Sequence, residues 1–400
     1  MKNWKEVLSK NFILMIIGMI LCGTAQMAVN TNSAAYAVGV LGLSQAQFGT
    51  VVSIAGIVVV ILYPLLGILC DKIRHGFCGA IGAVLLAVGF ILYMESTGFG
   101  SLTIARVIQT AGFGFVINAA LSIAAASVRP ALRSIAMTLY GLGPALSYFL
   151  GPQTGTTLFT KFGFRTMFIA CSVLAVICAV VFLLNTSKPE KNPDAPKKKA
   201  FGFEKTALPG FILSFLILQI VFISQNYATV SLMERGIQQA ALFWTVGAVI
   251  NIIARFFISG LIAKVGINKM FYGCVILLLI AVACIAAANN LGLVILAAVC
   301  WGIGYNGSQA SVMSVSVLRA SVDRVGQANS THQMGHNLAQ VVWAPVAGVL
   351  AGLLGYQGMF WCMLIPMAAG IVFYIACVHR MVNRVEAQKA AAKAKAESEA

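Results

Sequence analysis

The feature that most constrains this chain is a series of long apolar runs separated by short polar segments. Each run is close to the ~20 residues that a helix needs to cross ~30 Å of hydrocarbon. Apolar residues make up 60% of the sequence and charged residues 10%, whereas soluble domains carry about 25% charged residues. No run shows the period-two alternation of a barrel strand, so helices are the expected spanning elements. The sequence therefore predicts an all-α integral membrane protein.

We expect twelve spanning helices. The first run is too long for a secretory signal sequence and has no small-residue cleavage site, so we expect it to remain as the first helix. The predicted spans are residues 11–37, 47–70, 77–96, 99–126, 134–158, 166–185, 208–232, 239–263, 269–289, 291–318, 325–353 and 357–378.

The net charge of +16 is explained by where the basic residues lie. If both termini are cytoplasmic, nearly all basic side chains of the loops and helix ends fall on the cytoplasmic side, the exceptions being Lys161, Arg165 and Arg235. This is the positive-inside bias of multi-pass proteins of the cytoplasmic membrane. We therefore expect membrane lipid, and not nucleic acid, as the partner of the basic surface.

The helices divide into two halves that resemble each other. Residues 186–206 contain three prolines among six lysines, a composition typical of a flexible cytoplasmic linker. It separates a six-helix bundle, residues 1–185, from a second bundle, residues 207–378, which a cytoplasmic tail, residues 379–400, follows. Short matches recur in the same order in both bundles, as in 112–115 and 302–305. Such a repeat predicts a binding site between the halves near the midplane.

No pattern indicates an enzyme or a metalloprotein. The ten cysteines form no C-x-x-C pair, so neither a zinc site nor a disulfide framework is expected. No nucleophile–base set, phosphate loop or metal constellation is evident, so we expect no enzymatic activity, cofactor or metal.

The loop after the second helix carries the strongest resemblance to a known family. Gly67-x-x-x-Asp71-Lys72 resembles the G-x-x-x-D-(R/K)-x-G-R segment of the major facilitator superfamily, although Arg74 and His75 stand where glycine and arginine are usual. The resemblance implies a twelve-helix transporter fold and a conformational latch formed by Gly67, Asp71, Lys72 and Arg74. The alternative is that Asp71 is a solvated loop carboxylate.

Two motifs inside the helices extend this resemblance over the chain. Residues 106–112 match the family's R-x-x-Q-x-x-G, and residues 151–155 match a glycine-proline motif found mainly in antiporters, with Ser147 in place of an upstream glycine. Alternatively, the glycines allow close helix packing and the proline kinks its helix. The residues concerned are Arg106, Gln109, Gly112, Gly151, Pro152 and Gly155.

Two arginines are expected at membrane depth without an acidic partner. All eleven acidic residues lie in loops or at helix ends, whereas Arg106 and Arg255 lie well inside their helices. A charge at that depth costs at least ~2.5 kcal/mol and should face a partner or a wet cavity. Either each arginine caps backbone carbonyls, or the missing counter-charge is the substrate. Arg255 also stands where monocarboxylate and oxalate-type transporters of the family are similar.

Further polar residues could line the same site. The candidate substrate-binding residues are Arg106, Arg255, Gln26, Asn30, Tyr305, Asn306, Gln309, Gln225, Asn226 and His336. His332 and His336 lie on one helix face and can change charge near neutral pH, so they are also the candidates for proton coupling. The alternative for both is a hydrogen-bonded histidine in a polar lining.

The resemblance and the residues together predict a monomeric secondary active transporter of a small organic solute. The two unpaired arginines favour an anion such as a carboxylate, moved by proton symport or by exchange. The first alternative is an efflux pump for neutral or amphipathic compounds, which the glycine-proline motif and the apolar helices favour. A transporter-like receptor is the remaining alternative.

Overall fold

The structure is a computed structural model that describes residues 8–127, 139–187, 204–320 and 324–398. Within these ranges every regular element is a helix. The N-terminal half is built from α2 (Lys10–Gly39), α3 (Gln45–Lys72), α4 (His75–Met94), α5 (Phe99–Ala126) and α7 (Leu142–Leu183).

The C-terminal half follows in the same order of long helices. It consists of the 3-10 turn η2 (Lys205–Ala207), α8 (Leu208–Ile217), α9 (Gln219–Glu234), α10 (Leu242–Val265), α11 (Ile267–Ala287), α12 (Leu291–Val317), α13 (Val325–Cys362), α14 (Leu364–Phe373), the π-helical turn η4 (Tyr374–Val378) and α15 (His379–Ser398).

Two long helices each contain a sharp break at a glycine. In α7 the break is Gly163 (φ +82°, ψ +164°), and in α13 it is Gly355 (φ +69°, ψ +171°). Glycine adopts positive φ without the steric penalty that a Cβ brings. Both breaks fall between two predicted spans, at equivalent places in the two halves. They support the repeat inferred from the sequence.

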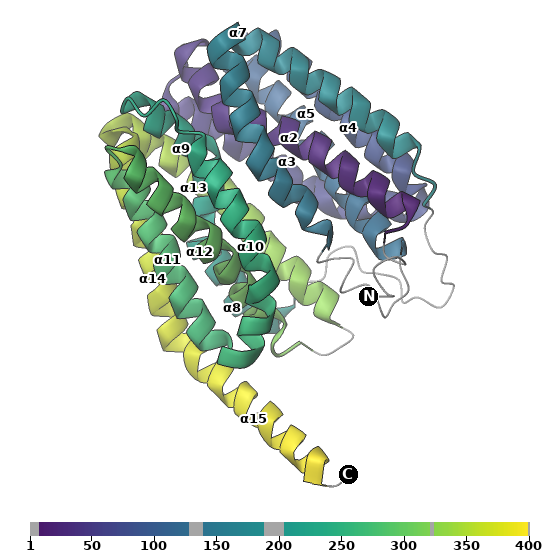
Figure 1. Cartoon of the computed structure of the whole chain (residues 1–400), viewed down its shortest axis with the longest axis vertical. Coiled ribbons are helices and arrows are strands. Elements are labelled where there is room, and N and C mark those ends of the chain that lie inside the picture. The colour runs from purple at the N-terminus through teal and green to yellow at the C-terminus, as the bar shows by residue number, and fades with distance from the viewer. Residues whose placement is uncertain (1–7, 128–138, 188–203, 321–323, 399–400) are drawn as a thin grey trace.

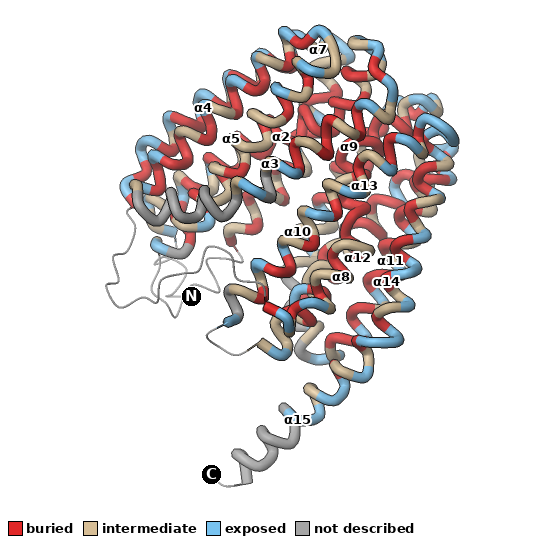
Figure 2. Tube along the Cα trace, turned by 180° about the vertical axis from the view of Figure 1, so that it is seen from behind, coloured by how far each residue is buried: buried red, intermediate tan, exposed pale blue. Residues whose placement is uncertain are grey.

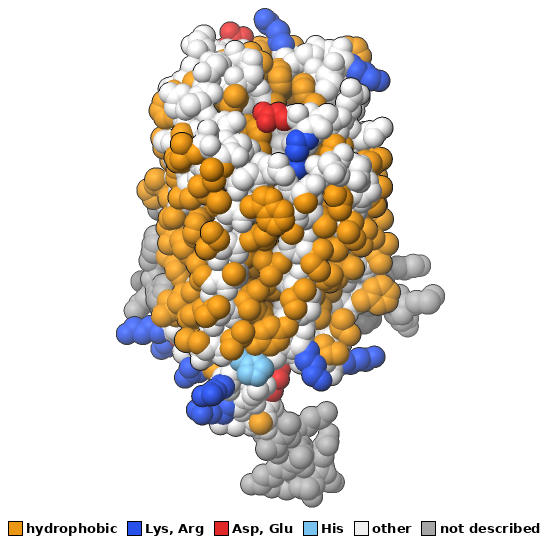
Figure 3. Space-filling view, turned by 90° about the vertical axis from the view of Figure 1, so that its left-hand side faces the viewer, with side chains coloured by type: hydrophobic (Ala, Val, Ile, Leu, Met, Phe, Trp, Pro, Cys, Tyr) orange, Lys and Arg blue, Asp and Glu red, His pale blue; other side chains and the backbone are white. Residues whose placement is uncertain are grey.

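The predicted all-α fold with twelve spans is confirmed. Eight helices of the described chain are long and apolar enough to cross a membrane, and α7 and the stretch 327–388 each hold two predicted spans. The apolar stretches Gln45–Val58 of α3 and Leu242–Arg255 of α10 cover the rest. Figure 3 shows an apolar band between charged side chains at the two ends of the molecule. The predicted seventh helix is interrupted, because α8 ends and α9 begins on either side of Leu218.

The core lies along the facing sides of the helices, as Figure 2 shows. We call the end at which α2 begins and α15 leaves the terminal end, and the opposite end the far end (Figure 1). α15 projects beyond the bundle, and its first turns are held by α11, where Glu386 Oε1 accepts from the backbone N–H of Ile267 at 3.0 Å. An anionic oxygen at a helix N-terminus is favoured by the helix dipole.

The two halves meet at the far end through α3 and α13. Ser53 Oγ donates to the carbonyl of Val341 at 2.5 Å. A Cβ on Gly49 would lie 2.5 Å from the carbonyl oxygen of Ala344 and 3.1 Å from Cα of Gly348. Figure 1 shows the bundles spreading apart from this contact toward the terminal end. The far end is therefore closed in this structure.

This close approach leads to a prediction for Gly49→Val. The new side chain would meet backbone atoms that cannot rotate away, and overpacking of this kind costs about 1–3 kcal/mol. We expect the variant to disfavour far-end closure and to lower the transport rate. Gly273→Val is the matched control, because nothing lies within 4 Å of a Cβ built on Gly273. Equal transport rates in the two variants would contradict the prediction.

One cysteine differs from expectation. Cys78, near the start of α4, is disulfide-bonded, and its partner's side chain lies outside the described residues. The prediction of no disulfide rested on sequence spacing, which does not detect cysteines that the packing of helices brings together. The other cysteines of the described side chains are free.

Candidate functional site

A cavity of about 270 Å³ lies between the two halves. Most of its wall comes from three helical stripes, whose lining residues recur at intervals of three or four positions and therefore share a face, and Val221 of α9 completes it. One stripe is on α7 and the residues just before it, one on α10 and one on α12. The lining residues are Tyr140, Gly141, Pro144, Ala145, Tyr148, Val221, Trp244, Gly247, Ala248, Asn251, Arg255, Trp301, Tyr305 and Gln309.

Arg255 is the one charged residue among the described residues that line this cavity. Its Nε is buried and has no hydrogen-bond partner. No hydrogen bond or ion pair joins the guanidinium to any residue in the described ranges. A guanidinium offers a planar fork of donors that matches the two oxygens of a carboxylate or phosphate. The cavity therefore presents an unused anion-binding group.

Aromatic rings form much of the remaining wall. The ring centroids of Trp244 and Trp301 are 6.0 Å apart in an edge-to-face arrangement, and Tyr305 stacks on Trp301 at 6.0 Å. Tyr148 approaches Trp244 from the other half at 6.0 Å. The indole N–H of Trp244 donates to Thr229 Oγ1 at 3.1 Å, which fixes the ring. One end of the cavity is thus apolar and rigid, and the other carries Arg255.

Arg106 lies in a different environment from Arg255. Only 2% of it is exposed, and it lines no part of the cavity. Nη1 donates to Asn30 Oδ1 at 2.8 Å, to the hydroxyl of Tyr93 at 3.2 Å and to Gln109 Oε1 at 3.4 Å, while Nη2 donates to Asn226 Oδ1 at 3.0 Å. All four partners are neutral oxygens, and Nε has none.

The hydrogen bond to Asn226 joins the two halves, because Arg106 is on α5 and Asn226 on α9. Within the N-terminal half, Gln109 Nε2 donates to Gln26 Oε1 at 3.0 Å and to Asn30 Oδ1 at 3.2 Å. This set, which we call the Arg106 cluster, contains residues of α2, α4, α5 and α9. The charge of Arg106 is solvated by amide and hydroxyl oxygens, and no acidic side chain of the described residues pairs with it.

Two more predicted binding residues engage protein partners. Gln225 Nε2 donates to the hydroxyl of Tyr148, which adds another hydrogen bond between the halves. Asn306 is not among the cavity's lining residues. Its Nδ2 donates to the backbone carbonyl of Asn251 at 2.8 Å. Of the ten residues expected to bind substrate, the structure brings Arg255, Tyr305 and Gln309 to the cavity wall.

The two histidines of α13 lie within the C-terminal half. His332 is buried, and its Nδ1 is 2.8 Å from Ser214 Oγ and 3.4 Å from Ser316 Oγ. The ring of His336 packs on Phe222 with centroids 4.5 Å apart, and its Nδ1 is buried without a partner. Neither histidine lines the cavity. Their role in proton coupling stays a prediction.

The predicted latch is described only in part. The side chains of Gly67, Asp71 and Lys72 lie outside the described residues. Arg74 Nη2 donates to the carbonyl of Leu183 at the end of α7. A cation at a helix C-terminus is favoured by the helix dipole. This contact is within the N-terminal half, at the terminal end.

The same end of the C-terminal half has its own charge contact. Glu204 Oε2 lies 3.5 Å from Arg324 Nη1. Glu204 Oε1 accepts from the backbone N–H of Thr206 at 3.2 Å and from its hydroxyl at 2.9 Å. These hydrogen bonds, with a smaller contribution from Arg324, hold the pKa of Glu204 below its ordinary value.

The glycines of the two helix motifs stand at close approaches between helices. A Cβ on Gly112 would lie 2.6 Å from the backbone nitrogen of Leu86 in α4. On Gly151 it would lie 2.7 Å from the carbonyl oxygen of Thr24, and on Gly155 2.6 Å from that of Ala28. Thr24 and Ala28 belong to α2. Pro152 lies inside α7, between these two glycines.

Sequence reasoning missed the aromatic wall and Asn251. A signal was present, since Trp244, Ala248, Asn251 and Arg255 recur on one face of α10. Trp301, Tyr305 and Gln309 do the same on α12. Arg255, Tyr305 and Gln309 of these faces were predicted from the sequence but neither tryptophan was, because aromatic residues in a membrane helix do not by themselves indicate a cavity.

A family model described as Major Facilitator Superfamily matches residues 14–331 and 269–399. The Uncharacterized MFS-type transporter YbcL of Bacillus subtilis (strain 168) is 25% identical over 156 residues, 39% of this chain and 40% of that protein. Multidrug resistance protein 1 of the same organism is 23% identical over 182 residues, 45% of this chain and 46% of that protein. The matched stretches thus span less than half the length of these curated relatives.

Solved structures resemble the chain over nearly its whole length. A mutant of the nucleoside transporter NupG gives a TM-score of 0.79 at 14% identity, covering 91% of this chain and 100% of that one. A bacterial homolog to the human lysosomal transporter Spinster, inward-facing and occupied, gives 0.76 at 12% identity, covering 94% and 96%. At these identities the likeness shows the fold alone.

Proposed function

Because the chain belongs to the Major Facilitator Superfamily and is thus a membrane transporter and not an enzyme, we propose that it carries a small amphipathic organic anion by alternating access. The observation that carries this proposal is the unpartnered guanidinium of Arg255 in the wall of the cavity between the halves. An anionic group of the substrate would supply the missing counter-charge.

Leaving the guanidinium charge of Arg255 unpaired at membrane depth is costly. Even on the lenient insertion scale, a charge at the centre of a spanning helix costs ~2.5–3.5 kcal/mol. A carboxylate, sulfonate or phosphate can accept two parallel hydrogen bonds from the guanidinium, and such charge-assisted pairs are stronger than neutral ones. No acid is among the described lining residues, so a cationic substrate would find no counter-charge there and would be repelled by Arg255.

The aromatic wall supports an amphipathic substrate. Trp244 and Trp301 present fixed ring faces and edges to the end of the cavity opposite Arg255. An apolar or planar group placed there would bury its surface, at ~25 cal/mol per Å². The cavity volume of about 270 Å³ is at the lower limit of ligand pockets, which typically hold ~300–1,000 Å³. A small monoanion fits better than a drug-sized compound.

The charge distribution supports an orientation in the cytoplasmic membrane. Basic residues gather at the terminal end, as the positive-inside rule describes for cytoplasmic segments. With both termini cytoplasmic, the closed far end faces outward, and the structure corresponds to an inward-facing state. The substrate would then leave the cavity along the faces of α7 and α10 that carry Gly141 and Arg255.

A matched set of ligands tests this proposal in proteoliposomes. Benzoate, benzamide and benzylammonium have similar size and an aromatic ring, but they carry negative, zero and positive charge. We expect benzoate to be taken up and exchanged, and the other two to be excluded. Adding phenylacetate and acetate separates the contribution of the ring from that of the charge. Uptake of benzamide or benzylammonium at the rate of benzoate would overturn the anion proposal.

An efflux pump for neutral amphipathic compounds is the second candidate. The partial likeness to Multidrug resistance protein 1, the Gly151-Pro152 motif and the aromatic cavity wall favour it. In this case benzamide-like compounds would be transported, and transport would not depend on Arg255. The same ligand set therefore distinguishes the two candidates.

Proton coupling by α13 is testable separately. If His332 or His336 carries the driving proton, replacing it by glutamine should remove pH-driven accumulation and preserve substrate counterflow, which needs no net proton movement. His379→Gln is the control, because this histidine lies at the start of α15, where its Nδ1 is 3.1 Å from the hydroxyl of Tyr272. Substrate binding that does not vary between about pH 5 and 8, where histidine titrates, would exclude both residues and leave exchange as the mechanism.

A further inference from the structure

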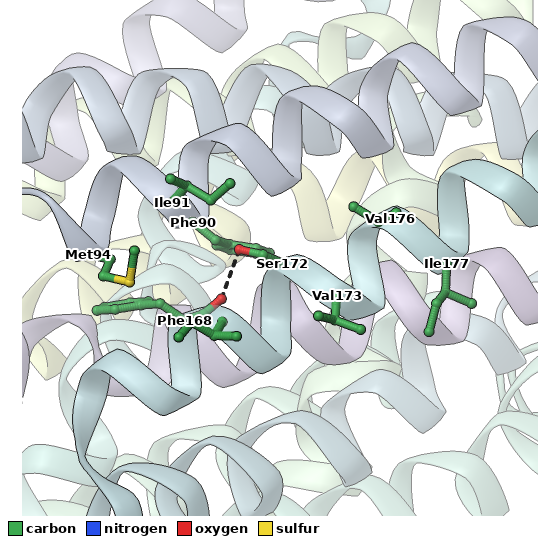
Figure 4. A pocket seen from close by; sticks show the side chains of 9 residues that line it. Phe90, Ile91, Met94, Phe168, Ser172, Val173, Val176 and Ile177 are labelled. Atoms are coloured by element: carbon green, nitrogen blue, oxygen red, sulfur yellow. Dashed lines mark hydrogen bonds between the residues drawn. The ribbon is translucent and has the colours of Figure 1, made fainter.

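A second cavity lies on the outer surface of the N-terminal half, away from the contact between the halves (Figure 4). It is a groove of about 330 Å³ between the last turn of α4 and the second part of α7. We call it the α4–α7 groove. Its lining residues are Phe90, Ile91, Met94, Phe168, Ile169, Ser172, Val173, Val176 and Ile177.

The groove is apolar and opens onto the surface that hydrocarbon covers. Its rim is about half exposed, as shown by Ile91 at 47%, Ile169 at 49% and Val173 at 52%. The floor is buried and includes Ser172, the one polar side chain of the lining. Its hydroxyl donates to the carbonyl of Phe168 at 2.8 Å, as Figure 4 shows, so the groove offers no free polar group.

The length of the groove suits one acyl chain. Along α7 it extends from Ile169 to Ile177, and at 1.5 Å per residue this distance is about 12 Å. One leaflet of the hydrocarbon core is about 15 Å thick, half of the whole. Because Met94 ends α4 at the far end, the groove begins at that surface and continues through most of one leaflet.

The mouth of the groove carries one charge of each sign. Arg165 stands one helical turn before Ile169 on α7, and Glu95 one turn beyond Ile91 at the end of α4, so each lies on the same face as its lining residue. Both side chains are exposed, and neither has a hydrogen bond or an ion pair to another described residue. The two charges flank the place where the headgroup of a lipid in the groove would lie.

From these observations we propose that the α4–α7 groove binds a phospholipid with a zwitterionic, primary-amine headgroup. One acyl chain occupies the groove, the phosphate contacts Arg165 and the ammonium donates to Glu95. Phosphatidylethanolamine has this chemistry. A quaternary ammonium has no N–H to donate to Glu95, and phosphatidylglycerol has no cation to place there. The proposal is independent of the substrate and of Arg255.

This lipid-binding proposal is tested with the purified full-length protein. Delipidated protein is mixed with phosphatidylethanolamine, phosphatidylcholine or phosphatidylglycerol of identical acyl chains, and bound lipid is counted by native mass spectrometry. A surface charge contributes about 1 kcal/mol, or roughly fivefold in affinity. We expect phosphatidylethanolamine to be preferred by about that factor. Glu95→Gln should remove the preference over phosphatidylcholine, and Arg165→Gln should weaken binding of all three lipids.

A separate variant tests whether an acyl chain occupies the groove. Val173→Trp fills the groove and should reduce retention of phosphatidylethanolamine, whereas Ile104→Trp, at a residue of α5 that is 59% exposed and outside the groove, should not. If Val173→Trp does not fold, the exposed Glu95 and Arg165 variants decide the matter. Equal retention of the three lipids by the wild type would overturn the proposal and leave only general lipid contact. A dimer that Val173→Trp dissociates would assign the groove to a second copy and also overturn it.

Discussion

Replacing Arg255 by glutamine is expected to weaken binding of the transported anion by at least about thirtyfold. Truncating one member of a desolvated charge pair costs about 2–5 kcal/mol, and 2 kcal/mol corresponds to roughly thirtyfold. The substrate would keep its contacts with Trp244 and Trp301 but lose its only counter-charge among the described lining residues. Binding of benzoate to the purified protein, followed by calorimetry, measures the effect directly.

Two further variants separate charge from fold in this test. Arg255→Lys keeps the charge but loses the planar fork, so an intermediate affinity is expected. Arg319→Gln removes an exposed arginine at the end of α12 and should leave benzoate affinity unchanged. If Arg255→Gln binds benzoate as tightly as the wild type, Arg255 is structural and the anion proposal loses its support.

Replacing Arg106 by methionine is expected to impair transport while leaving anion affinity within a few-fold of the wild type. Methionine fills similar space but leaves the Oδ1 of Asn226 without its donor, whereas Asn30 Oδ1 still accepts from Gln109 Nε2. Each buried acceptor left unpaired costs about 1–3 kcal/mol. Because one of these hydrogen bonds joins the halves, part of this cost falls on the state that is closed at the far end. The equilibrium constant for closing the far end should therefore fall several-fold.

Distances between spin labels on the far ends of α3 and α13 report this shift. The double variant with Asn226→Leu should be less impaired than the two single effects combined, because the residues share one hydrogen bond. Asn118→Leu is the control, because Asn118 donates only to the carbonyl of Gly114 in its own helix. Loss of benzoate binding in Arg106→Met with an unchanged distance distribution would restore the alternative, in which Arg106 binds the substrate.

The different positions of these two arginines could not be read from the chain. Both are single cations well inside apolar helices, and sequence reasoning assigned both the same role. The structure surrounds Arg106 with four neutral oxygens and gives Arg255 no partner among the described residues. The difference depends on the rotation of each helix about its axis and on which neighbours it meets. Neither of these is determined by the residues of the helix alone.

Much of the fold was determined by the sequence alone. Hydrocarbon thickness sets the length of each apolar run, and backbone polar groups in lipid must be satisfied within a helix, so runs of about 20 residues specify spanning helices. The gaps between predicted spans in which Gly163 and Gly355 lie, and the repeat of the two halves, were predicted for similar local reasons. The tertiary structure alone decided which polar groups pair, which side chains line the cavity and which end is closed. Those outcomes follow from contacts between helices far apart in the chain, such as α3 with α13 and α5 with α9.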